Sequence, residues 1–96
     1  MNSYKIVNTE KEQELYSIIY NINKTAFEAE DISIFLDIFP RQQELYIAMD
    51  EVLINYVNHI NSFITKFEEY RKENIISLDL HRDYKSLKKY KKDNGI

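Results

Sequence analysis

The side chains best suited to chemistry stand near the end of the chain, where Asp79, His81 and Asp83 occupy every second position. In a β-strand these three would share one face, and carboxylates together with an imidazole can hold a metal ion. The other interpretation is a solvated segment of mixed charge that opens a helix, since a bare spacing of this kind is a weak signal. We favour the helix and predict no metal site.

Covalent catalysis and phosphate binding also lack their usual residues. The chain has no cysteine, and His59 and His81 lie 22 positions apart without a motif around either; nucleophilic catalysis needs a nucleophile beside a base. The only glycine is Gly95, so no glycine-rich loop can bring backbone amides close to a phosphate. We therefore predict a protein that is not an enzyme and carries no cofactor.

A segment rich in lysine and tyrosine follows at residues 84–92. Lysines bind phosphates and tyrosines stack on bases, so the segment could bind nucleic acid. A helix end that matches its own dipole and pairs with an acidic body explains the same residues. Because the segment has no arginine and the chain is acidic, nucleic acid is the less favoured partner. The lysines that would carry this alternative are Lys85, Lys88, Lys89, Lys91 and Lys92.

The window Val52–Thr65 has no charged residue, although 30% of the chain is charged. Its polar side chains recur on one face of a helix, and Glu51 and Glu69 stand at the two ends of that face. A surface that is uncharged at its centre and charged at its rim is typical of a protein–protein interface; an Asn-rich face that simply meets solvent is the alternative. The side chains of this candidate partner-binding stripe are Ile54, Asn55, Asn58, Asn61, Ser62 and Thr65.

Length and composition restrict the class of protein. Ninety-six residues with 44% hydrophobic content suffice for one domain, residues 1–96, with a modest core. The lack of cysteine favours a reducing compartment, and no signal-like or membrane-spanning run occurs, so we expect a cytoplasmic protein without a membrane partner. The net charge of -3 divides into -6 over residues 1–77 and +3 over residues 78–96.

The pattern of apolar residues predicts long helices, and one glycine and one proline leave few tight turns. Capping boxes at Thr9 and Thr25 and a helix start at Pro40 divide the chain into helices at residues 10–24, 26–38, 40–73 and 79–92. Residues 4–8 could form a short extended arm, and residues 76–80 either a strand or the start of the last helix. The predicted fold is an all-α bundle of three to four helices with one long central helix, and a helix content above about 60%.

The apolar faces of these helices predict the core. Phe35 lies on the inner face of the second helix, and Leu53, Ile60 and Phe67 lie on the broad apolar face of the long helix. That helix is long for a domain of this size, so a part of it should remain for another molecule to cover.

These observations together favour a protein-binding module, a small inhibitor or regulator that acts stoichiometrically through the face of its long helix. A homodimer is the simplest form of this prediction. In size and helical class alone, the chain is similar to bacteriocin immunity proteins and to phage-encoded inhibitors of bacterial enzymes. The alternatives are a nucleic-acid-binding regulator that uses the lysine-rich segment and a structural or assembly subunit.

Overall fold

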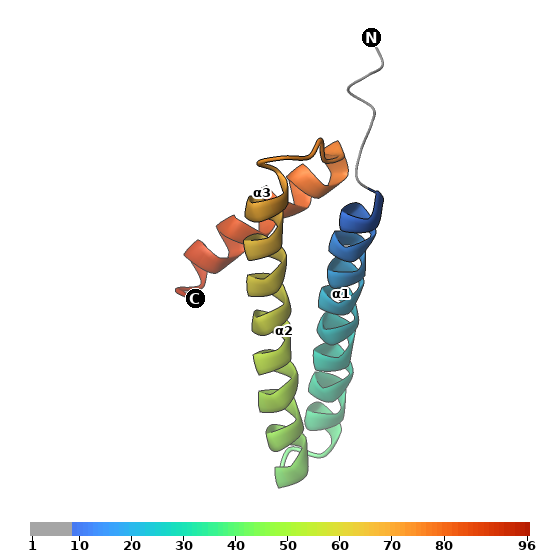
Figure 1. Cartoon of the computed structure of the whole chain (residues 1–96). Helices are drawn as coiled ribbons and strands as arrows, with labels where there is room; N and C mark the ends of the chain where they lie inside the picture. Colours follow the sequence, from blue (N-terminus) through green and yellow to red (C-terminus); the bar gives the residue numbers. More distant parts are fainter. Residues whose placement is uncertain (1–8) are drawn as a thin grey trace.

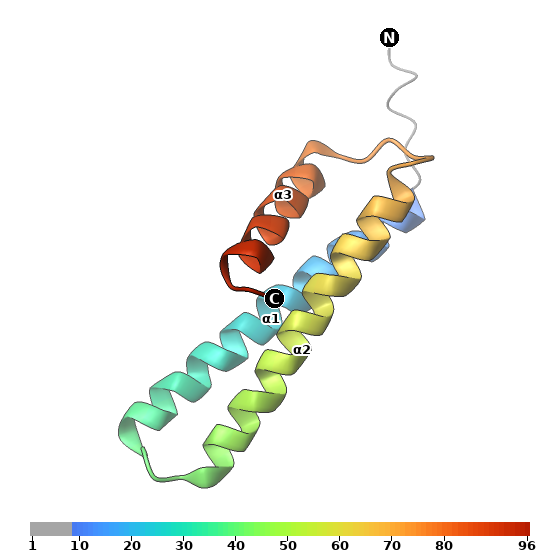
Figure 2. The same cartoon turned by 90° about the vertical axis from the view of Figure 1, so that its left-hand side faces the viewer.

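Two long helices form a hairpin, and a shorter third helix lies across one end of it (Figures 1 and 2). The computed structural model describes residues 9–96, so the expected arm at residues 4–8 lies outside the described residues. Helix α1 is Thr9–Ile38, α2 is Gln43–Tyr70 and α3 is Leu78–Asp93. Helices make up 84% of the described residues and no strand occurs among them, which confirms the predicted all-α class. The molecule is elongated, with extents of 60 × 23 × 16 Å.

Helix α1 is continuous, whereas the sequence analysis predicted a break at Thr25 between helices 10–24 and 26–38. The Thr25 hydroxyl donates back to the carbonyl oxygens of Asn21 and Ile22, both at 2.9 Å, and does not cap a new helix. Threonine can bond in this way in a helix interior. Its side chain is buried, as are those of Ile18 and Ile22 on the same face. The buried face of α1 therefore runs up to Thr25 without a break in the helix.

The chain reverses at residues 39–42, so α2 begins at Gln43 and not at Pro40 as predicted. Pro40 lies in the turn, and its carbonyl oxygen accepts a hydrogen bond from the Tyr46 hydroxyl at 2.9 Å. The residue before a proline avoids the helical conformation, which agrees with the end of α1 at Ile38. Helix α2 ends at Tyr70, three residues before the predicted position 73.

The hydrophobic core lies where the three helices meet, at the end of the hairpin away from its turn. Phe67 is central: its ring stacks on Tyr84 of α3 with 4.4 Å between centroids and meets His81 edge-on at 4.9 Å. The predictions that Ile60 and Phe67 are core residues are confirmed, and those for Phe35 and Leu53 are wrong, since both are about half exposed. The fully buried side chains are Leu15, Ile60, Phe63, Phe67 and Leu80.

Phe35 and Leu53 lie on a part of the hairpin that α3 does not reach (Figure 2). Helix α3 has 16 residues, against 30 in α1 and 28 in α2, and it ends near the middle of the hairpin (Figure 2). No residue from 26 to 59 is buried. We call residues 26–59 the bare half of the hairpin, and residues 9–25 together with 60–70 the covered half.

Polar contacts fix the start of α3 against α1. The backbone amide of Ser77 donates to the Glu12 carboxylate at 2.7 Å, and the Ser77 hydroxyl bonds to the hydroxyl of Tyr16 at 2.9 Å. Helix α3 begins at the next residue, Leu78. Residues 76–80 therefore contain the start of a helix and not a strand.

Candidate protein-binding surface

One line of side chains on α2 is covered at one end and bare at the other. Residues seven apart lie almost on one line along a helix. Along such a line, Phe67 and Ile60 are 0% exposed, while Leu53 is 46% and Tyr46 is 50% exposed. The four residues are all large and apolar, so the difference comes from what covers them. An exposed apolar face that continues a buried one is a candidate surface for another molecule.

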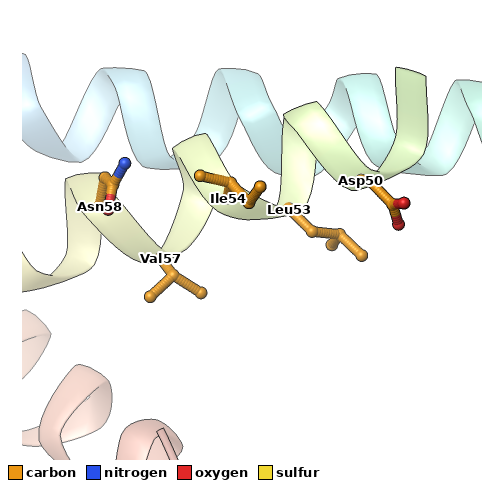
Figure 3. A pocket seen from close by; sticks show the side chains of 5 residues that line it. All are labelled: Asp50, Leu53, Ile54, Val57 and Asn58. Carbon is orange, nitrogen blue, oxygen red and sulfur yellow. The ribbon is translucent and has the colours of Figure 1, made fainter. Parts of the chain in front are cut away.

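A shallow hollow of ≈ 450 Å³ lies on this bare stretch of α2. Leu53 and Val57 point away from α1, toward the side of α2 on which α3 lies (Figure 3). All the lining side chains come from one helix, so the hollow is open to solvent and suits a protruding apolar side chain better than an enclosed small ligand. Its lining residues are Asp50, Leu53, Ile54, Val57 and Asn58.

The turn end of the hairpin is also apolar. Hollows of ≈ 230 and ≈ 330 Å³ lie there, and Phe39 lines both. Phe27 and Ile34 add exposed apolar surface to α1 in the same half. Large exposed apolar side chains thus occur along the whole bare half, from the turn to the end of α3. A single exposed apolar residue needs no explanation, but so many in one half of the hairpin do.

The six residues of the predicted partner-binding stripe lie in three different surroundings. Ile54 and Asn58 line the α2 hollow, and Asn55 and Thr65 are exposed outside it. Two further members of the stripe, Asn61 and Ser62, are half-buried beside the core. The Asn61 Oδ1 atom is buried and has no hydrogen-bond partner among the described residues. The structure therefore brings two of the six predicted residues to the hollow.

Leu53 and Val57 were not predicted to lie at the surface, because their spacing equals that of true core residues. Periodicity shows which face of a helix is apolar, but not how far along the helix a neighbour extends. The available signal was length: the predicted last helix of residues 79–92 is too short to cover a helix of residues 40–73.

The second property of this surface is its negative charge. Residues 26–59 contain seven acidic residues and one basic residue, Arg41, a net charge of -6. All seven carboxylates are exposed, and none forms an ion pair within the described residues. They are Glu28, Glu30, Asp31, Asp37, Glu44, Asp50 and Glu51.

Three carboxylates of the covered half, by contrast, have partners: those of Glu12, Glu14 and Glu68. Glu14 accepts a hydrogen bond from the Tyr70 hydroxyl and pairs with Lys66 at 3.2 Å. The Tyr70 hydroxyl, and next Lys66, hold the pKa of Glu14 below its ordinary value. In the same way, the Tyr84 hydroxyl is the main cause that lowers the pKa of Glu68. Each carboxylate joins two helices, because Glu14 binds from α1 to α2 and Glu68 from α2 to α3.

The lysine- and tyrosine-rich segment lies on α3, and much of it contacts the rest of the chain. Lys88 pairs with Glu68 at 3.3 Å, and Lys89 pairs with Asp93 at 2.8 Å. The Tyr90 ring meets that of Tyr56 at 5.8 Å, and Tyr84 is buried. Lys85 and Lys92 are exposed, while Lys91 is half-buried. Of the tyrosines that could stack on bases, Tyr84 is thus buried, whereas Tyr90 packs on Tyr56 and remains 36% exposed.

The residues considered for metal binding also separate. On a helix, Asp79, His81 and Asp83 do not share one face. Asp79 pairs with Arg82 at 2.6 Å, His81 packs on Phe67, and partial burial raises the pKa of Asp83. Among residues 9–96, no group of histidine and carboxylate side chains is arranged to hold a metal ion.

Within the described part of the chain, no helix combines the length and apolar character needed to cross a bilayer. In comparisons with protein-family models, with curated proteins and with solved structures, no significant match to this chain is found.

Proposed function

We propose that the protein is a non-enzymatic protein-binding module, a small inhibitor or regulator that acts stoichiometrically through the bare half of its hairpin. The observation that carries the proposal is the line of large hydrophobic side chains from Phe67 to Tyr46, which passes from fully buried to half exposed. Another protein that covers Leu53 and its apolar neighbours would remove this surface from water. Each Å² of apolar surface buried in this way stabilises the complex by roughly 25 cal/mol.

The composition of the surface supports the same proposal. Interfaces combine an apolar centre with a polar rim. Here Leu53 and Val57 form the apolar centre, and Asp50 and Asn58 stand at its edge. All side chains that line the hollow come from α2, so the helix fixes their spacing along the surface.

The nucleic-acid alternative has less support. Two of its five lysines are paired with carboxylates of the chain itself, and Tyr84 is buried. A nucleic acid would have to displace these contacts before it gained its own. No contact of the described residues favours it over a protein partner.

The experiment is site-specific photo-cross-linking in cells of the source organism. A photoreactive amino acid replaces Ile54 in the bare half or, as the matched control, Leu78 at the start of α3. Both positions are exposed and apolar, at 60% and 80%. We expect one protein adduct of defined mass from position 54 and none of that mass from position 78.

A second measurement tests the stoichiometry. The captured protein is purified and mixed with the intact module, and sedimentation should show a one-to-one complex. The variant Leu53→Lys should lose that complex while its helical circular dichroism spectrum is retained. Equal adducts from both positions, or a complex that Leu53→Lys leaves intact, would overturn the proposal.

A further inference from the structure

We propose that the partner binds the bare half with a basic amphipathic helix that lies on α2 as α3 does, farther along the hairpin. This inference rests on the proposed function and specifies its partner. It follows from three features: how α3 already covers α2, the length that α3 leaves bare, and the charge of that length.

Helix α3 provides the pattern for such a helix within the molecule. Its apolar side chains Leu80 and Tyr84 are buried against the core. Its segment, residues 78–93, has a net charge of +3. At its edge Lys88 pairs with Glu68 of α2 at 3.3 Å. The chain thus covers the first part of the line on α2 with a basic amphipathic helix.

The same arrangement of α2 side chains recurs in the bare half without an occupant. A helix makes five turns in 18 residues, so Asp50 lies on the same side of α2 as Glu68. Leu53 likewise repeats the position of Ile60 and Phe67. Figure 3 shows Asp50 and Leu53 pointing to the side of α2 on which α3 lies. Asp50 is thus placed to bind a lysine or arginine of the partner, as Glu68 binds Lys88.

The uncovered length fits a short helix. Tyr56 is the α2 residue that meets Tyr90 near the end of α3. From there α2 continues back to its start at Gln43, which corresponds to about 13 residues or ~20 Å of bare helix. A partner helix of three to four turns would span it.

Charge distinguishes this partner from the other possible occupants. The bare half has a net charge of -6. A symmetric dimer through the same surface would bring two such halves together, and an anionic membrane would repel them. A basic helix would instead neutralise Asp50 and its neighbours while its apolar stripe covers Leu53 and Val57.

The experiment uses designed 16-residue peptides as probes of the intact protein. The first peptide has leucines at helical spacing and lysines elsewhere, the second has glutamates in place of the lysines, and the third is a scrambled form of the first without an apolar stripe. Calorimetry gives the affinity and stoichiometry, and circular dichroism gives the helix formed on binding. We expect one-to-one, helix-forming binding of the first peptide alone, weakened as salt is raised.

Matched variants locate the binding on α2. Leu53→Gln should weaken the lysine peptide roughly tenfold or more, because it removes one buried apolar contact. Leu78→Gln, an exposed leucine outside the bare half, should change the affinity less than about twofold. Asp50→Asn should weaken binding and flatten its salt dependence, whereas Glu51→Gln on the neighbouring face should have little effect.

Each contrary result removes a defined part of the inference. Equal binding of the glutamate peptide would remove the basic partner, and equal binding of the scrambled peptide would show that no helix is recognised. A dimer of the protein alone that Leu53→Gln dissociates would identify a second copy as the occupant. If no peptide binds while position 54 still cross-links a one-to-one partner, the helix inference falls and the proposed function stands. If no peptide binds and position 54 cross-links no partner, both the helix inference and the proposed function are overturned.

Discussion

The covered and bare halves of the hairpin are built from similar residues and differ in their neighbours. Both present large apolar side chains on the line that runs along α2. In the covered half Phe67 packs between α1 and α3, and its carboxylate neighbours bind tyrosines and lysines. In the bare half Leu53 has α1 on one side and solvent on the other, and the carboxylates are unpaired within the described residues.

The difference shows that the length of the third helix decides which residues become core. Two helices alone can cover each other along one narrow strip, whereas three helices enclose side chains completely. Most of the free energy of packing should therefore reside at the covered end. The bare half is free to serve another purpose, since the core does not depend on it.

The largest expected effect is a contrast between two phenylalanines. Phe67 is 0% exposed and Phe35 is 50% exposed. Phe67→Ala should lower the free energy of unfolding by roughly 3–5 kcal/mol, because it leaves a cavity in the core. Phe35→Ala should lower it by less than about 1 kcal/mol, since that side chain is already half in water. Urea denaturation of both variants checks the contrast, and similar losses would contradict it.

Hydrogen exchange should reveal the same contrast without any substitution. Amides of residues 60–70 should open only in near-global unfolding, while amides of residues 43–55 should open locally, at a free energy lower by about 2 kcal/mol or more. Residues 26–28 report on the continuity of α1. Their amides lie in a helix interior here, whereas in a helix that began at residue 26 they would be unprotected first-turn amides. Fast exchange at 26–28 with slow exchange at 32–36 would restore the predicted break.

The third prediction concerns pH and the covered half. The folded pKa of Glu14 is lowered, so its contribution is present above the ordinary carboxyl pKa and is lost as pH falls through the folded pKa. Tyr70→Phe removes the hydroxyl that is the main cause, so the pKa of Glu14 should rise toward its ordinary value. The loss of stability at neutral pH should be about 1 kcal/mol or less, because the carboxylate is partly exposed.

Carboxyl NMR titration of the folded protein measures that pKa directly. Tyr20→Phe is the matched control, because Tyr20 lies on α1, the helix of Glu14, and is exposed. An unchanged Glu14 pKa in Tyr70→Phe, or the same shift in both variants, would show that the hydroxyl does not hold this carboxylate.

Much of the fold could be predicted because it depends on local patterns. Apolar periodicity identified the helical segments, and the position of Pro40 marked the reversal between α1 and α2. The break at Thr25 could not be excluded from sequence. The Thr-x-x-Glu pattern is the same whether the threonine hydroxyl caps a new helix or bonds to carbonyl oxygens of the preceding turn. Only the neighbouring helix, which buries Thr25, decides between the two.

The candidate surface was harder to predict, because exposure is a tertiary property. The uncharged window predicted Ile54 and Asn58, and both line the hollow. The same reasoning excluded Leu53 and Val57, whose spacing matches the core. It also treated Asn61 as surface, although the approach of other helices half-buries it. The sequence pattern thus pointed to the helix on which the hollow lies, but it did not locate the boundary between the covered and bare parts of that helix.

The smallest expected effect tests that boundary with one pair of residues. Ile54 and Asn61 are seven apart and share a line on α2, yet the apolar one is 60% exposed and the polar one is half-buried with an unpartnered Oδ1 atom.

A buried polar atom without a partner is unfavourable, and leucine is also a better helix former than asparagine. Asn61→Leu should therefore stabilise the protein by up to about 1 kcal/mol. Asn58→Leu, the exposed control, should gain only the few tenths of a kcal/mol that helix propensity supplies. Ile54→Asn should change stability by less than about 0.5 kcal/mol but should abolish the one-to-one complex with the captured protein in sedimentation. Thermal denaturation measures the stability of all three variants. A loss of stability in Asn61→Leu would mean that its amide oxygen is bonded in solution, and a large loss in Ile54→Asn would place Ile54 in a core that the bare half does not have here.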